Sequence, residues 1–127
     1  MITRQLCGQF HRAVELIGRR WNGAIVFVLL PGRARFCELR AAIPDITDRM
    51  LTERLQELER EGLVVRTVIP DTPVRVEYSL TNKGRSLGDT IQTITAWGHK
   101  WLPKPATRTE SRALPAVPTR RPRRRVS

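Results

Sequence analysis

The stretch ITDRMLTERLQELEREGLVVR, residues 46–66, constrains the fold of this chain more than any other segment. Three leucines recur in it at i, i+4 and i+7: Leu51, Leu55 and Leu58. This spacing predicts a helix that buries one apolar face. Gly62 stands where a left-handed C-cap ends a helix, and the β-branched residues after it predict a strand. An amphipathic helix is therefore expected to run directly into a strand.

The amino end and the polar face of this helix carry the residues of interest. Thr47 suits the N-cap position, and Asp48 lies in the first turn, where the helix dipole is positive. With the leucines facing inward, a rotation of 100° per residue leaves a polar set on the opposite face: Arg49, Thr52, Glu53, Gln56 and Arg60. Such a face is either ordinary solvated surface or a surface that meets a partner.

Periodicity elsewhere predicts a mainly α fold with one small β-hairpin. Helices are expected over residues 8–18, 21–30, 35–43 and about 82–102, and strands over 63–69 and 74–80. A short helix joined by a turn to a longer one, with a hairpin directly after it, is the layout of a winged helix–turn–helix domain. The expected fold class is therefore α+β.

In a helix–turn–helix the second helix enters the major groove of DNA, and its first turns reach the base edges. Arg49 could pair with guanine, Gln56 with adenine, and Glu53 with the amino group of cytosine. Thr47 and the first amides of the helix suit a phosphate oxygen, because a helix amino end is partly positive. The acidic residues of the second half of the helix would repel phosphate. Only its first half is expected in a groove.

Arginines in and near the hairpin suit contact with the DNA backbone or the minor groove: Arg33, Arg66 and Arg75. The net charge of +11 agrees with an anionic partner. Residues 103–127 contain eight Lys and Arg against one Glu, and five of the nine prolines. This composition predicts a disordered basic tail after a folded domain of residues 1–102. Blocks of like charge serve as nucleic-acid-binding arms or as solubilising tails.

Several function classes lack support in the sequence. No apolar run reaches the length of about 18 residues that a membrane span needs, and no secretory signal is visible. Two cysteines, Cys7 and Cys37, form neither a disulfide framework nor a metal-binding motif. No catalytic motif is present. We therefore expect a cytoplasmic protein that is not an enzyme and holds no cofactor or metal.

Separate motifs along the chain resemble one known family. They are GRRW (18–21), GRARFCEL (32–39), the stretch 46–66, PVRVEYSLTNKG (73–84) and AWGHKW (96–101). In this order and spacing they are similar to the HxlR-type bacterial winged helix–turn–helix regulators. The resemblance runs from about Leu6 to Leu102 and leaves the basic tail outside. It implies a homodimeric transcription factor that represses or activates at a palindromic operator on double-stranded DNA.

The resemblance also implies that the first and last helices form the dimer interface. The apolar residues predicted there are Phe10, Leu87, Ile91, Ile94, Trp97 and Trp101. A stripe of this size on a terminal helix is typical of an interface. The alternative is that the last helix only packs on the core of its own chain.

Many members of this family carry a cysteine before the first helix that senses electrophiles or oxidants. Cys7 lies in that region, but one residue further from Trp21 than the family pattern has it. Arg4 and His11 lie at i−3 and i+4, and positive charge lowers the pKa of a neighbouring thiol. Cys7 is therefore either a redox sensor or an inert terminal thiol.

Two functions from other classes remain as alternatives to a sequence-specific repressor. A non-specific architectural protein would explain the basic tail equally well. A winged-helix protein-interaction module would use the same fold without touching DNA. Scrambled duplexes separate the first from a specific regulator, and the Arg49→Ala variant separates the second.

Overall fold

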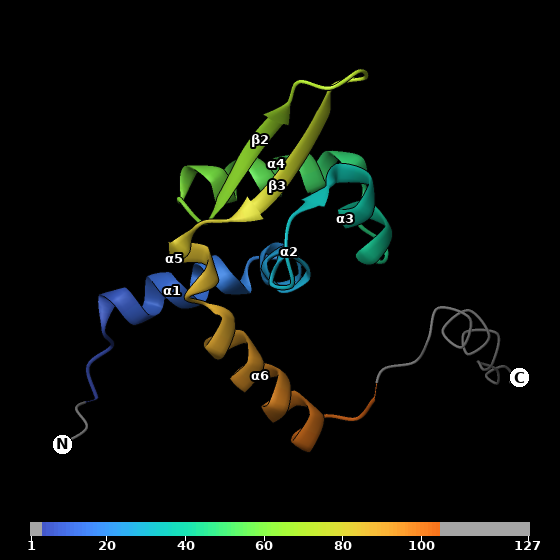
Figure 1. Ribbon diagram of the computed structural model, residues 1–127. Coiled ribbons are helices and arrows are strands. Elements are labelled where there is room, and N and C mark those ends of the chain that lie inside the picture. The colour runs from blue at the N-terminus through green and yellow to red at the C-terminus, as the bar shows by residue number, and fades with distance from the viewer. Residues whose placement is uncertain (1–3, 105–127) are drawn as a thin grey trace, which may run out of the picture. The chain divides into compact units, whose positions relative to one another are not determined.

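The computed structural model describes residues 4–104 of the chain (Figure 1). The chain divides into two compact units, Met1–Thr93 and Ile94–Ser127. The predicted tail, except Pro103 and Lys104, lies outside the described residues. No helix among residues 4–104 is both long enough and apolar enough to cross a membrane.

The helices are α1 (Gly8–Gly18), α2 (Asn22–Leu29), α3 (Phe36–Ala42), α4 (Asp48–Arg60), α5 (Asn82–Arg85) and α6 (Gly88–Trp101). The strands are β1 (Ala34–Arg35), β2 (Val64–Ile69) and β3 (Arg75–Leu80). This order confirms the predicted α+β winged helix–turn–helix. The turn between β2 and β3 lies at the far end of the hairpin from the helices (Figure 1).

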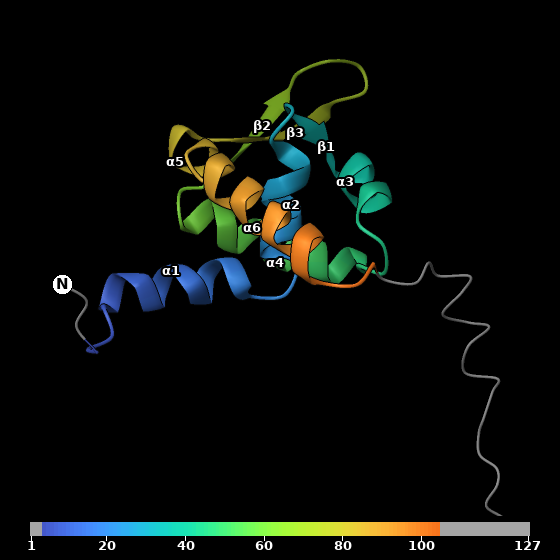
Figure 2. The ribbon, with the colours of Figure 1, turned by 90° about the horizontal axis from the view of Figure 1, so that it is seen from below.

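The core of the first unit is built around α2, which contacts α1, α3, α4 and β3 (Figure 2). Its near-uniform apolar sequence suits this position, because a helix covered on several sides has no polar face to show to water. The α4 leucines Leu51, Leu55 and Leu58 are at most 1% exposed. The leucine stripe therefore anchors α4 to the core, as the sequence predicts.

Local chemistry sets both ends of α4. The Thr47 hydroxyl accepts a hydrogen bond from the backbone N–H of Met50 at 3.1 Å, which confirms the predicted N-cap. At the other end, Gly62 has a φ of +78°, a conformation that favours glycine. The chain then turns directly into β2.

The sheet has one strand more than the predicted hairpin. The order is β1-β3-β2, and β1 pairs antiparallel with β3 through Ala34 opposite Tyr78 and Arg35 opposite Glu77. A two-residue strand has no periodicity of its own to detect. Only its long-range pairing creates it, so the sequence-based prediction missed it.

The expected single helix over 82–102 was also wrong. Thr81 caps α5, because its hydroxyl accepts from the backbone N–H of Gly84 at 3.1 Å, but α5 ends at Arg85. A Cβ at Gly84 would lie 2.2 Å from the carbonyl oxygen of Leu63, so only glycine permits this close approach. Gly84 and Gly88 both weaken a continuous helix, and α6 starts afresh at Gly88.

Candidate nucleic-acid interface

The amino-terminal half of α4 presents a polar face to solvent. Arg49 has a side-chain exposure of 87%, and its Nε donates to Glu53 Oε2 at 3.1 Å. Thr52 and Gln56 are exposed on the same face, while Glu53 is partly covered. The predicted base-reading residues are therefore accessible, and nothing in the first unit buries them.

The first turn of α4 is tied to α3. Asp48 Oδ1 forms an ion pair with Arg40 Nε at 2.8 Å, and Arg40 lies in the last turn of α3. The turn between the two helices includes Asp45, whose φ is +70°. The Thr47 cap and the Arg40–Asp48 ion pair together fix the amino end of α4, the part expected to enter a groove of DNA.

The second half of α4 holds a charged cluster that the sequence-based prediction did not single out. Arg54 and Glu57 are each only 13% exposed, and Arg54 Nη1 donates to Glu57 Oε1 at 2.9 Å. Arg19, from beyond the end of α1, donates through Nη1 to Glu57 Oε2 at 2.9 Å. A rotation of 100° per residue places Arg54 beside Leu58, so a signal for its burial was present in the sequence.

The wing consists of the β2–β3 hairpin and the residues beside it. Two of the three arginines predicted to act there lie next to one carboxylate. Glu77 on β3 is 14% exposed and accepts from Arg33 Nη1 at 3.2 Å. Arg75 Nη1 lies 3.8 Å from the same carboxylate, and Arg75 Nη2 donates to Asp71 at 2.8 Å. Arg66 lies on β2 opposite Tyr78 and is exposed. The pairing of β1 with β3 explains how Arg33 reaches the hairpin.

Cys7 is exposed and occupies the N-cap position of α1. Its carbonyl oxygen accepts from the backbone N–H of His11 at 3.0 Å, but the His11 imidazole lies 3.3 Å from Glu15. Cys37 on α3 is exposed as well. Among residues 4–104, no group of three or more His, Cys, Asp or Glu side chains is placed to hold a metal ion.

The predicted dimer residues fall into two sets. Ile91 is 7% exposed and belongs to the core of the first unit, and Leu87 packs against that core. These two residues pack on the core of their own chain, and their place in a dimer interface stays a prediction. The other four are more than half exposed: Phe10, Ile94, Trp97 and Trp101.

A winged helix–turn–helix with an accessible, leucine-anchored second helix defines a class of DNA-binding protein. A family model described as HxlR-like helix-turn-helix matches residues 16–106. The chain therefore belongs to the HxlR-like helix-turn-helix family, and it is a DNA-binding transcriptional regulator.

Relatives in Bacillus subtilis (strain 168) agree with this assignment. The HTH-type transcriptional regulator YvaP is 49% identical over 102 residues, which cover 80% of this chain and 94% of YvaP. The HTH-type transcriptional regulator YodB is 45% identical over 96 residues, which cover 76% of this chain and 86% of YodB.

Solved structures show the same fold. The reduced form of YodB matches with a TM-score of 0.70 at 44% identity, over 77% of this chain and 96% of that one. The oxidised form of the redox regulator HypR also has a TM-score of 0.70, at 37% identity, over 77% of this chain and 99% of HypR.

Proposed function

We propose that this protein acts in the cytoplasm as a homodimeric, sequence-specific repressor on a palindromic operator, and that it works by binding rather than by catalysis. The observation that carries the proposal is the exposed polar face on the first half of α4. Arg49 projects there from a helix whose opposite side is fully buried. A dimer would set two such helices one DNA turn, about 34–36 Å, apart.

Sequence reading is assigned to the first half of α4. Arg49 is suited to guanine, Gln56 to adenine, and Glu53 to cytosine. Thr52 lies between them on the same face, and Thr47 with Asp48 holds the amino end in place. Glu53 also holds the Arg49 guanidinium at 3.1 Å, so Arg49 must exchange this partner for a base edge on binding.

Positioning on the backbone is assigned to the wing. Arg33 is 70% exposed and Arg75 is 38% exposed, so both can reach phosphate although Glu77 lies beside them. Arg66 adds an exposed positive charge on β2. We also assign non-specific affinity to the basic tail, residues 103–127. Each phosphate contact made by these groups would steepen the dependence of affinity on salt.

Dimerisation is assigned to the apolar side chains that the chain leaves exposed near its ends. Phe10, Ile94, Trp97 and Trp101 are 60%, 54%, 57% and 63% exposed, respectively. Large exposed aromatic side chains are costly in water and are enriched at interfaces. Sedimentation of a Trp97→Asp variant tests this assignment: the wild type is expected to be a dimer and the variant a monomer.

We further propose that an oxidant or electrophile acts on the protein through Cys7. The relatives support this idea: HypR is described as a redox regulator, and YodB has been solved in diamide-treated and quinone-bound forms. Cys7 is exposed, as a sensor must be. The competing interpretation is an inert terminal thiol.

Footprinting on the DNA upstream of the protein's own gene tests the proposal. We expect protection of a palindrome that an oxidant relieves in the wild type but not in the Cys7→Ser variant. Equal affinity for scrambled duplexes would favour an architectural protein, and DNA binding that is indifferent to Arg49→Ala would argue against base reading by α4. Protection that does not change with oxidant would remove the sensor but keep the regulator.

A further inference from the structure

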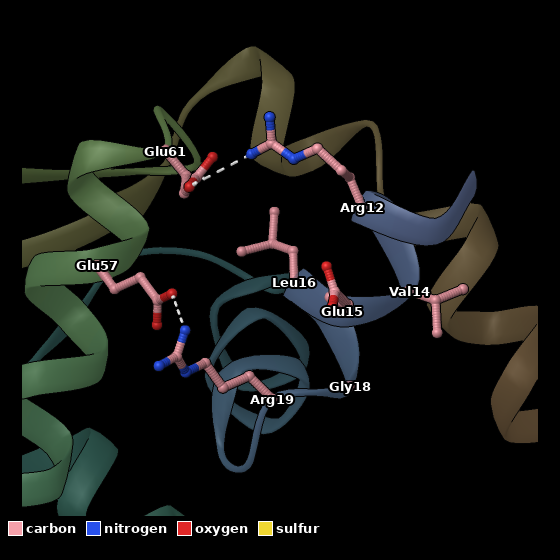
Figure 3. Close-up of a pocket in the computed structure, with 8 residues that line it drawn as sticks. All are labelled: Arg12, Val14, Glu15, Leu16, Gly18, Arg19, Glu57 and Glu61. Atoms are coloured by element: carbon pink, nitrogen blue, oxygen red, sulfur yellow. Dashed lines mark hydrogen bonds and ion pairs between the residues drawn. The ribbon is translucent and has the colours of Figure 1, made fainter. Parts of the chain in front are cut away.

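Helices α1 and α4 face each other across an open cleft of about 600 Å³ (Figure 3). Two ion pairs cross it. Arg12 Nη2 lies 4.0 Å from Glu61 Oε2, and Arg19 Nη1 lies 2.9 Å from Glu57 Oε2. Leu16 lies between the two pairs (Figure 3). Helix α1 has no fully buried residue, although Leu16 packs against the core, and these pairs are polar contacts between α1 or the turn after it and α4.

The two ion pairs differ in burial. In the outer pair, Arg12 is 77% exposed and Glu61 is 34% exposed, so water and salt screen their attraction. In the inner pair, Glu57 is only 13% exposed. The inner carboxylate also accepts from Arg54 Nη1 at 2.9 Å and from Asn22 Nδ2 at 3.5 Å. Charge-assisted bonds to a shielded carboxylate are the stronger kind.

The partners of Glu57 come from three parts of the fold. Arg54 is on α4 itself, Arg19 follows α1, and Asn22 is the first residue of α2. Asn22 is 1% exposed, and its Nδ2 also donates to the backbone oxygen of Leu16 in α1 at 2.9 Å. The Glu57 carboxylate therefore connects α4 to the corner between α1 and α2.

This connection lies beside the base-reading face. Glu57 directly follows Gln56 and is eight residues from Arg49, which is about 12 Å along a helix axis. Base-reading side chains must be held to within about 0.5 Å of their productive positions. The Thr47 cap and the Arg40–Asp48 pair hold the amino end of α4, and the Glu57 cluster is placed to hold the other end.

We propose that Glu57, held by Arg19, Arg54 and Asn22, is a positioning residue: it sets the orientation of α4 against the α1–α2 corner and so controls operator specificity without touching DNA. The inference rests on the proposed function. It predicts that loosening this cluster lowers affinity for the operator more than affinity for unrelated DNA.

Two charge-neutral double variants test the inference. R19Q/E57Q removes the inner pair, and R12Q/E61Q removes the outer pair, so both keep the net charge of the wild type. Each is titrated, under conditions where it is fully folded, with the duplex protected in the footprint and with a scrambled duplex of the same length. We expect R19Q/E57Q to lower the ratio of the two affinities about tenfold and R12Q/E61Q to change it less than about twofold.

Single variants provide a second test in case R19Q/E57Q does not fold. Arg19 is 57% exposed, so Arg19→Gln is expected to fold, and Arg12→Gln is its matched control. Arg19→Gln should lower the affinity ratio about threefold while leaving the scrambled duplex unaffected. Equal weakening on both duplexes would instead mean that Arg19 contacts phosphate, and would overturn the inference.

The outcomes separate the inference from the function on which it rests. A wild-type protein without preference for the protected duplex would overturn both. A wild-type preference that R19Q/E57Q retains in full would overturn the positioning role alone. A loss of thermal stability in R19Q/E57Q with an unchanged affinity ratio would likewise leave Glu57 a purely structural residue and overturn the inference.

Discussion

Helix α4 carries two arginine–glutamate pairs that look alike by distance and differ in surroundings. Arg49 and Glu53 approach to 3.1 Å, and Arg54 and Glu57 to 2.9 Å. Arg49 is 87% exposed and Glu53 is 43% exposed, whereas both members of the second pair are 13% exposed. One pair faces solvent at the amino half of the helix, and the other is built into the junction with α1 and α2.

On this helix, burial rather than distance separates a pair that is open to a new partner from a pair that is held in the fold. An exposed pair is worth little and exchanges easily, so Arg49 is available to a base edge. A shielded carboxylate loses its partners only at a large free-energy cost, because water does not replace them. We therefore propose recognition by one arginine–glutamate pair and positioning by the other.

The strongest test of this comparison removes each carboxylate in turn. Glu57→Ala is expected to lower the free energy of unfolding by about 2–3 kcal/mol, because it leaves Arg54 shielded without a counter-charge. Glu53→Ala should change it by less than about 0.5 kcal/mol. Urea unfolding at equal protein concentration measures both. Equal losses would erase the distinction between the two pairs.

Arg49, in the exposed pair, is the residue whose loss should weaken specific DNA binding most. Arg49→Ala is expected to weaken binding to the protected duplex by about 1–3 kcal/mol, which is roughly fivefold to more than hundredfold, because a bidentate pair to a base is lost. Arg60→Ala removes the same charge from the other end of α4 and should have a small effect on specificity. Fluorescence anisotropy titrations compare them, and similar losses would show a purely electrostatic role for Arg49.

The amino end of α4 depends on its Thr47 cap. Thr47→Ala should lower stability by about 1 kcal/mol, because the N–H of Met50 loses its capping oxygen. Thr52 is exposed to solvent and lies away from the ends of the same helix. Thr52→Ala should be neutral or slightly stabilising, because alanine is the better helix former. Thermal unfolding without DNA is the measurement. A destabilising Thr52→Ala of the same size would contradict the capping role.

The smallest expected effect concerns the competition of Glu53 with DNA for Arg49. Glu53→Gln should raise the affinity for a scrambled duplex about twofold at low salt, since it releases the guanidinium and removes a negative charge facing the duplex. Glu59→Gln removes the same charge from the second half of α4 and should raise it less. The gain should disappear at high salt, and its persistence there would rule out an electrostatic cause.

The parts of α4 that depend on neighbouring residues were predictable from the sequence. The leucine spacing, the Thr47 cap and the stop at Gly62 act within a few residues, so the pattern shows them directly. The exposure of Arg49 followed from the same helical rotation. The base-reading and wing roles of the predicted residues, by contrast, stay predictions that binding experiments must test.

Other features depend on residues that are distant in the chain. The strand β1 exists only because Ala34 and Arg35 meet Tyr78 and Glu77 on β3. The burial of Ile91 in the core could be seen only in the packed first unit. The helix break between α5 and α6 could have been anticipated from Gly84 and Gly88, but the need for glycine at position 84 was visible only from the nearby carbonyl of Leu63.

The sequence by itself determined the helix–turn–helix, the hairpin after it and the polar face of α4, because periodicity, caps and glycine stops are local properties. Only the tertiary structure decided that Glu57 is the α4 charge that joins Arg19 and Asn22. That choice depends on which helices pack beside α4, and burial changes the strength of a charge interaction more than the identity of the residues does.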